Sequence, residues 1–280
     1  MDQSLPTTRD GRRAAGHPAV IDTAGVTRSF DALVAEALAA PIEGWNFDWL
    51  DGRATEERPP WRYSRRATRA IAEADRVLDV QTGGGELLAE MLADAPTDPA
   101  MVAATESWAP NAARACRTLA PFGVRVSVVE DASALPFDDA TFDLVLSRHP
   151  VVTRWDEVSR VLRPGGRYVA QHVGAGSNRE LTDFLMGEQP VASLRSPERA
   201  EVDARRAGLD VRDLRRATLV VEFFDIGSVV YFLRLVPWTV PGFVVDRYRD
   251  RLSDLHRSIE TEGAFRCHAQ RFFIEAVRPG

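Results

Sequence analysis

The sequence predicts an α/β fold in which helices are wound on both faces of a mostly parallel, seven-stranded sheet that ends in an antiparallel strand. Short apolar runs alternate with helical stretches from residue 76 onward. A glycine-rich turn joins the first of these runs to a helix. Hydrophobic residues make up 45% of the 280 residues, which is enough for a sizeable core.

The individual elements follow from apolar periodicity. The expected strands are 77–80, 101–105, 124–129, 142–147, 167–173, a strand within 211–224, and 264–277. The expected helices among them are 86–93, 110–119, 155–162 and 178–186. Further helices are expected before and after this core, at 29–40, 63–74, 226–235 and 244–260.

The chain divides into three expected parts. Residues 1–25 are polar, with Pro, Gly and arginines, and predict a flexible tail. Residues 26–75 predict an N-terminal helical cap. Residues 76–280 predict the main domain, with a helical insertion near 225–260.

Composition narrows the function classes. The formal net charge of −6 argues against a protein that mainly grips phosphate backbones, so no nucleic acid partner is expected. All 35 basic residues are arginine, which excludes a Schiff-base lysine and a phosphate-loop lysine and suggests a GC-rich bacterial genome.

Neither a signal segment nor an apolar run of roughly 18 residues is visible, so we expect a soluble, cytoplasmic protein without a membrane partner. The two cysteines, Cys116 and Cys267, do not lie at metal-ligand spacing. Residues 1–280 contain no cluster of Cys, His and carboxylates at ligand spacing, so no metal is expected.

The first chemical motif is VLDVQTGGGE at residues 77–86, a strand that runs through a glycine turn into a helix. Gly83 and Gly85 allow a sharp turn and a close approach of the backbone to a ligand. Asp79 lies at the carboxyl end of the strand, where open α/β sheets bind ligands. A tight turn without a ligand is the structural alternative. A Rossmann-like architecture is the natural context for this motif.

Two acidic positions follow later strands. Glu106 ends the strand VAATE, where a carboxylate can accept hydrogen bonds from both hydroxyls of a ribose. Asp131 follows the next strand, where its carboxylate can accept from an adenine amino group while the Ala132 amide donates to a ring nitrogen. Without the glycine loop, Glu106 would be an ordinary solvated residue.

These segments occur in a fixed order with two more, LPFDDATFD at 135–143 and LRPGG at 162–166. In that order they resemble class I methyltransferases that use S-adenosyl-L-methionine, and in particular the type 11 subgroup that includes the ubiquinone/menaquinone-type C-methyltransferases. The resemblance spans residues 77–173, about a third of the chain. It implies that the main domain, 76–280, is a methyltransferase domain.

The resemblance also implies a cofactor site. Asp79, Gly83 and Gly85 would surround the methionine part and the ribose, and Ser147 would lie near the methionine end. The remaining positions are Glu106 at the ribose hydroxyls and Asp131 and Ala132 at the adenine. The sequence departs from the family at Gln81, which replaces the first loop glycine. Gln81 could donate to the carboxylate of the cofactor or point outward.

Catalysis needs a base only if the acceptor must lose a proton. His149 follows the fourth strand, beside the expected methyl group, and is the candidate general base. A histidine that caps the strand is the alternative. Arg148 could neutralise an acidic substrate, and His172 is a weaker candidate for contact with the acceptor.

Aromatic residues before and after the core could form a lid that excludes water, or simply pack the added helices. They are Trp45, Phe47, Trp49, Trp61, Tyr231, Phe232, Trp238 and Phe243. An arginine group at helical spacing is more often a solvated face than a phosphate site. Its members are Arg62, Arg65, Arg66 and Arg69.

The function predicted from these features is methyl transfer to a small-molecule acceptor, such as a secondary metabolite or a quinone-like compound. The alternatives are an RNA or protein methyltransferase and a cofactor-binding pseudoenzyme with a regulatory or interaction role. A nicotinamide-dependent oxidoreductase would need a third loop glycine at position 88, where Leu88 stands.

Overall fold

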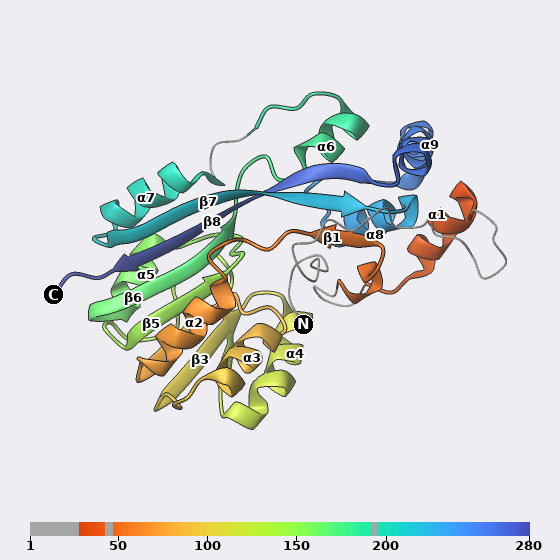
Figure 1. The fold of residues 1–280 in the computed structure, drawn as a ribbon. Coiled ribbons are helices and arrows are strands. Elements are labelled where there is room, and N and C mark those ends of the chain that lie inside the picture. Colours follow the sequence, from red (N-terminus) through yellow and green to blue (C-terminus); the bar gives the residue numbers. More distant parts are fainter. Residues whose placement is uncertain (1–27, 43–46, 192–194) are drawn as a thin grey trace.

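A computed structural model describes residues 28–42, 47–191 and 195–280. Its described part contains one eight-stranded sheet in the order β1-β7-β8-β6-β5-β2-β3-β4 (Figure 1). The strands are β1 (Ala54–Glu56), β2 (Arg76–Val80), β3 (Met101–Glu106), β4 (Arg125–Val128), β5 (Phe142–Arg148), β6 (Leu162–Val173), β7 (Asp210–Phe223) and β8 (Phe265–Val277). The predicted 1–25 tail and Trp45 lie outside the described residues.

The sheet confirms the predicted fold class. Strands β4, β3, β2, β5 and β6 pair in parallel, and the final strand β8 runs antiparallel to both β6 and β7. The chain proceeds outward from β2 through β3 to β4 and then returns to β5 on the other side of β2. The strand order therefore reverses at β2, and open α/β sheets bind ligands beyond the carboxyl ends of the strands at such a point.

Helices cover both faces of this sheet. One face packs against α2, α3 and α4, and the other packs against α5 and α7. The helices are α1 (Phe30–Ala39), α2 (Tyr63–Ala72), α3 (Glu86–Asp94), α4 (Ala109–Leu119), α5 (Trp155–Val161), α6 (Arg179–Met186), α7 (Pro197–Arg206), α8 (Ile226–Leu235) and α9 (Val245–Glu262). Two short 3-10 helices lie at Asp48–Leu50 and Ala120–Phe122.

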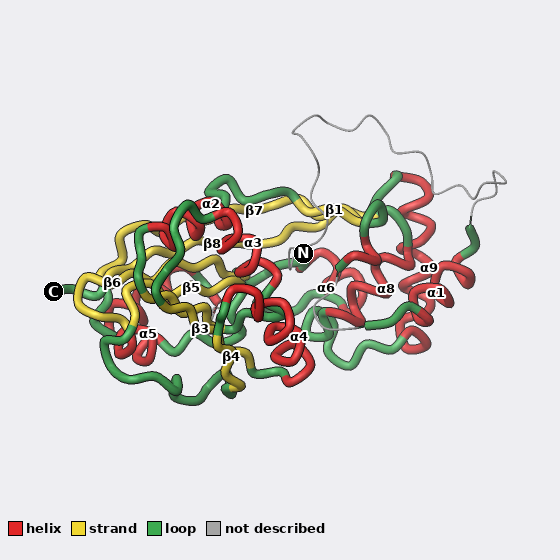
Figure 2. Tube along the Cα trace, turned by 90° about the horizontal axis from the view of Figure 1, so that it is seen from below, coloured by secondary structure: helices red, strands yellow, loops and turns green. Residues whose placement is uncertain are grey.

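A separate core lies where β7 and β8 extend beyond the parallel strands. It joins their ends and β1 to helices α1, α6, α8 and α9. Figures 1 and 2 show these helices gathered at one end of the molecule, away from α2, α3 and α5. The long antiparallel pair thus connects the parallel sheet to a helical group beside its carboxyl edge.

Two elements were not anticipated from the sequence. Strand β1 pairs antiparallel with β7 as the eighth strand, from Ala54 against Phe223 to Glu56 against Val221. Helix α7 begins after Ser196, whose side chain accepts a hydrogen bond from the Arg199 amide. No helix in the described ranges is long and apolar enough to cross a membrane.

Candidate active site

The glycine-rich turn connects β2 to α3 at the point where the strand order reverses. The Gly83 amide donates to Oε2 of Glu106, at 2.8 Å, which ties the turn to the end of β3. Gly85 has a φ of 82°, and a Cβ there would lie 2.8 Å from Cγ of Leu119 and 3.3 Å from Cα of Ala115. Glycine at position 85 therefore allows the start of α3 to approach α4 closely.

Glu106 is buried at the end of β3 and borders the main cavity. Its carboxylate accepts from the Gly83 amide and, through Oε1, from the Ser107 and Trp108 amides at 3.0 Å each. Burial raises the pKa of Glu106, although these hydrogen bonds oppose the shift. A carboxylate offers about four acceptor directions, so three occupied ones leave room for a further donor.

Asp79 and Ser147 are buried near the carboxyl ends of β2 and β5. Burial raises the pKa of the Asp79 carboxyl to about 7, with the Thr82 side chain opposing the shift and Glu106 adding to it. Neither Asp79 nor Ser147 is among the residues that border the main cavity. The Ser147 hydroxyl donates to the Val80 carbonyl at 2.8 Å and so connects β5 to β2.

Gln81 adopts a left-handed backbone conformation, with a φ of 59°, in place of the glycine found in the family. Its side chain holds the loop that follows β5. Nε2 donates to the Val152 carbonyl at 2.7 Å, and Oε1 accepts from the Val151 amide at 2.6 Å. Gln81 also borders the main cavity, so its side chain connects the glycine-rich turn to the wall beyond β5.

Asp131 and Ala132 follow β4 on a loop at the same edge. Asp131 borders the cavity, and its Oδ1 is buried without a hydrogen-bond partner. A buried carboxylate oxygen without a partner is costly unless a ligand or solvent donor satisfies it. Ala132 is exposed, does not border the main cavity, and accepts a hydrogen bond from Arg154 through its carbonyl.

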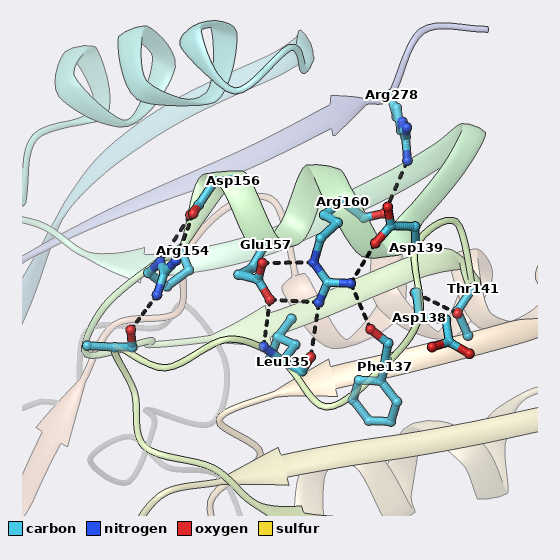
Figure 3. A network of polar contacts seen from close by, with 11 residues as sticks. Leu135, Phe137, Asp138, Asp139, Thr141, Arg154, Asp156, Glu157, Arg160 and Arg278 are labelled. Carbon is cyan, nitrogen blue, oxygen red and sulfur yellow. Dashed lines mark hydrogen bonds and ion pairs between the residues drawn. The ribbon is translucent and has the colours of Figure 1, made fainter.

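Figure 3 shows the polar network that fixes the chain after Asp131. Glu157 accepts from the Leu135 amide at 2.6 Å, and Arg160 donates to the carbonyls of Leu135 and Phe137 at 3.0 and 2.7 Å. Arg160 also pairs with Glu157 and Asp139, at 2.7 and 2.8 Å. The LPFDD segment and the α5 helix thus form one unit, because a partly buried ion pair of the helix satisfies the loop backbone.

The main cavity has a volume of about 660 Å³ and opens along the carboxyl edge of the sheet. One half is bordered by the predicted cofactor positions Gln81, Gly83, Glu106 and Asp131. The other half is bordered by the chain after β5 and β6 and by α6 and α8. Its side chains include Phe47, Glu56, Arg148, His149, Arg179, Thr182, Asp183, Arg195, Phe232, Val236, Trp238, Thr239 and Arg271.

A buried ion pair forms part of this second half. Arg271 on β8 donates from Nη2 to both carboxylate oxygens of Glu56 on β1, at 2.8 and 3.0 Å. Both side chains are less than a tenth exposed. Sequence reasoning missed Glu56 and Arg271, although a charged residue inside the apolar β8 run was a visible signal.

His149 borders the cavity just beyond β5 and has a φ of 56°. Its amide donates to the Gln171 carbonyl at 2.7 Å, and its Nε2 lies 2.9 Å from Nε2 of Gln171. Burial, with Arg148 and Arg271 adding to it, holds the pKa of His149 well below its usual value. Gln171 was also missed; strand alternation puts it on the face opposite His172, which was the available signal.

The other candidate residues divide into those that border the main cavity and those that do not. Arg148 borders the cavity, as do Phe47, Phe232 and Trp238 among the aromatic candidates. His172 lies on the far face of β6, stacked on Phe272 with ring centroids 4.6 Å apart, and burial lowers its pKa to about 3.

The remaining aromatic and arginine candidates do not border the main cavity. They are Trp49, Trp61, Tyr231, Phe243, Arg62, Arg65, Arg66 and Arg69. Trp49 stacks on Tyr231 with centroids 4.7 Å apart, which is packing within the helical group. The described residues contain no group of three or more His, Cys, Asp or Glu that could hold a metal ion.

The doubly wound sheet, the glycine-rich turn at the strand reversal and the acidic residues ending β3 and following β4 are features of a Rossmann-like domain. Residues 78–170 match the family model described as a methyltransferase domain. For residues 78–170, this match confirms the resemblance to type 11 methyltransferases that was drawn from the motifs.

Curated relatives agree with this assignment. The chain is 31% identical over 188 residues to the 27-O-demethylrifamycin SV methyltransferase of Amycolatopsis mediterranei, covering 63% of this chain and 60% of that protein. It is 35% identical over 118 residues to the ubiquinone/menaquinone biosynthesis C-methyltransferase UbiE of Geobacter sulfurreducens, covering 39% of this chain and 46% of that protein. The chain thus spans about half the length of the curated relatives it matches.

Solved structures share the fold. The YcgJ protein of Bacillus subtilis superposes with a TM-score of 0.54 at 17% identity, covering 79% of this chain and 99% of that protein. A candidate methyltransferase of Bacillus halodurans gives a TM-score of 0.52 at 16% identity, covering 77% and 98%. At these identities the likeness concerns the fold alone.

Proposed function

We propose that the protein transfers a methyl group from S-adenosyl-L-methionine to a small-molecule acceptor. The observation that carries the proposal is the single cavity that joins Gly83, Glu106 and Asp131 to a second, mixed apolar and polar half. A volume of about 660 Å³ is within the range of roughly 300–1,000 Å³ typical of small-molecule sites.

The residues of the first half fit the cofactor. Glu106 has an acceptor direction left for a ribose hydroxyl, and the buried Oδ1 of Asp131 is available for an adenine amino group. The proposed cofactor site also includes Gly83, Gly85, Gln81, Asp79, Ala132 and Ser147. The last three do not border the cavity. When bound, the cofactor supplies a methyl group on a sulfonium ion.

The second half supports a small organic acceptor. Phe47, Phe232 and Trp238 give it apolar surface, while Arg148 and His149 offer polar contacts. We propose that the helical group around α8 and α9, together with the cap elements before residue 76, covers this acceptor. The relatives named for rifamycin and ubiquinone/menaquinone substrates support an acceptor of the secondary-metabolite or quinone-like kind.

This chain would accelerate transfer mainly by holding both reactants in line and excluding water. The proposed mechanism needs no metal. A bacterial, cytoplasmic enzyme without nucleic acid partners stays a prediction from the sequence, as does the candidate role of His149 as general base.

Calorimetry with S-adenosyl-L-methionine tests the proposal. Asp131→Ala should weaken binding by about 1.5–3 kcal/mol, because a buried charged acceptor is lost, and should leave folding stability nearly unchanged because Oδ1 has no protein partner. Glu106→Ala should weaken binding by roughly 1–3 kcal/mol and also loosen the glycine turn. Absence of binding by the unmodified protein at millimolar cofactor would refute the proposed function.

A screen with radiolabelled cofactor against metabolite, RNA and protein pools tests the acceptor class. Label entering small molecules is the expected outcome. Label entering only RNA or protein would overturn the small-molecule assignment, and cofactor binding without transfer to any pool would favour a pseudoenzyme.

A further inference from the structure

Trp61, Gln171 and His149 form a hydrogen-bonded chain that ends at the cavity wall. The indole Nε1 of Trp61 donates to Oε1 of Gln171 at 2.7 Å, and Nε2 of Gln171 lies 2.9 Å from Nε2 of His149. Trp61 and Gln171 are both buried, whereas His149 borders the cavity. These hydrogen bonds join three segments that are far apart in sequence: the residues before α2, strand β6, and the end of β5.

The donors and acceptors in this chain have only one consistent arrangement. An indole N–H can only donate, so the oxygen of the Gln171 amide must face Trp61. The Gln171 NH₂ group then faces His149 and can only donate to it. Nε2 of His149 must therefore be the unprotonated acceptor, and the proton of the neutral ring is on Nδ1.

The surroundings of His149 oppose a second proton. A proton on Nε2 would confront the Gln171 NH₂ group, donor against donor. Arg148 is adjacent in sequence, Arg271 lies on β8 and is paired with Glu56, and His172 lies on the far face of β6. Each of these adds to burial in disfavouring the charged ring.

The backbone supports the same geometry. His149 adopts a left-handed conformation, which costs a residue with a Cβ free energy. Its amide donates to the Gln171 carbonyl at 2.7 Å, so Gln171 holds both the backbone and the ring. Among the described residues, Gln171 is the one hydrogen-bond partner found for the ring, which leaves Nδ1 without a protein acceptor.

We propose that Trp61 and Gln171 are positioning residues that lock His149 as a neutral Nδ1–H donor, so that His149 holds an electron-rich oxygen or nitrogen of the acceptor and does not remove its proton. The proposed contact between His149 and the acceptor rests on the proposed function. The fixed tautomer of His149 does not depend on that function. The acceptor class that fits is one whose nucleophile is neutral or already ionised when it binds.

Nitrogen-15 NMR of histidine-labelled protein without any cofactor tests the lock directly. The resonances of His149, assigned by comparison with His149→Gln, should show a protonated Nδ1 and an unprotonated Nε2. They should stay constant from about pH 6 to pH 8, the range in which an ordinary histidine titrates. A ring protonated at Nε2, or a titration midpoint near the usual histidine value, would overturn the proposal.

Gln171→Glu provides the matched variant, because it replaces the amide by a carboxylate of nearly the same shape. The carboxylate still accepts from Trp61 but now also accepts from a protonated Nε2, so the His149 midpoint should rise by about 1–3 pH units. Trp61→Phe frees the amide to turn over and should give a mixture of the two tautomers. An unchanged His149 spectrum in both variants would refute the proposal that Trp61 and Gln171 fix the His149 tautomer, even if the protein binds cofactor normally.

Discussion

At the scale of single residues, Gln81 shows how a side chain can take over a position whose backbone suits glycine. A left-handed conformation costs a residue with a Cβ about 1–2 kcal/mol. Gln81 offsets this cost with two hydrogen bonds to the backbone of Val151 and Val152. The sequence showed that the position departs from the family pattern, but the loop it binds lies 70 residues further on and was not visible.

Two substitutions at position 81 separate the backbone cost from the hydrogen bonds. Gln81→Ala loses both side-chain hydrogen bonds and keeps the free-energy cost of the left-handed backbone. Gln81→Gly also loses both hydrogen bonds, but glycine adopts this backbone conformation without that cost. Gln81→Gly should therefore be more stable than Gln81→Ala by about 1 kcal/mol in urea unfolding. Equal stabilities of the two variants would show that the backbone at this position is relaxed.

Gly85 makes a second residue-scale prediction. Gly85→Ala adds a Cβ 2.8 Å from Leu119 and imposes a φ of 82°, so it should cost about 2–4 kcal/mol of unfolding free energy. Gly123→Ala is the control, since it has a φ of 66° and no atom within 4 Å of the added Cβ. If both variants lose the same stability, the contact with α4 contributes nothing.

At the scale of elements, the sequence predicted best where one strand or helix carries its own periodic signal. The core helices and strands from β2 to α5 were predicted within a few residues. Strand β6 begins at Leu162, earlier than the predicted start at residue 167. Strand β1 was missed because its three residues carry no pattern and gain order only by pairing with β7. Helix α7 was missed because it buries only Ala200 and Ala204, although Ser196–Pro197 is a helix-start signal.

The Glu56–Arg271 pair tests how β1 is held. Glu56→Ala leaves a buried arginine without its carboxylate and should cost about 3–5 kcal/mol in unfolding free energy. Replacing both partners, by Glu56→Leu with Arg271→Met, should recover most of that loss because no charge stays buried. A double variant as unstable as Glu56→Ala would show that the two residues act through packing instead of charge.

At the scale of the whole molecule, the candidate site contains some residues that the sequence predicted and others that it did not. Gly83, Glu106 and Asp131 were predictable because local motifs mark the ends of neighbouring parallel strands. The second half of the cavity was predicted in part, because sequence candidates such as His149 and Phe232 border it. Glu56 and Arg271 were missed, since they come together only through the antiparallel strands β1, β7 and β8. The charged Arg271 within the apolar β8 run signals that a partner is needed, but the local sequence does not show which strand supplies it.

Asp79 couples the stability of the whole fold to pH. Its pKa is about 7 in the folded protein, against an ordinary value of 3.8, so the folded state keeps a proton that the unfolded state has lost. Stability therefore falls as pH rises from about 4 to about 7, because burial of an ionised carboxylate becomes necessary. The protonated Asp79 carboxyl contributes its full stabilisation below the pKa of the unfolded state, and this stabilisation is lost above the pKa of the folded state.

Asp79→Asn should remove this pH dependence, because its amide carries no charge to bury. The variant should match the original protein near pH 4 and exceed its stability at pH 8 by up to about 4 kcal/mol, the free energy equivalent of the pKa difference. Denaturant unfolding of both proteins at several pH values, without cofactor, measures the effect. Parallel stability curves would show that Asp79 ionises freely in the fold, and a variant less stable than the original at pH 8 would show that its charge is stabilised there.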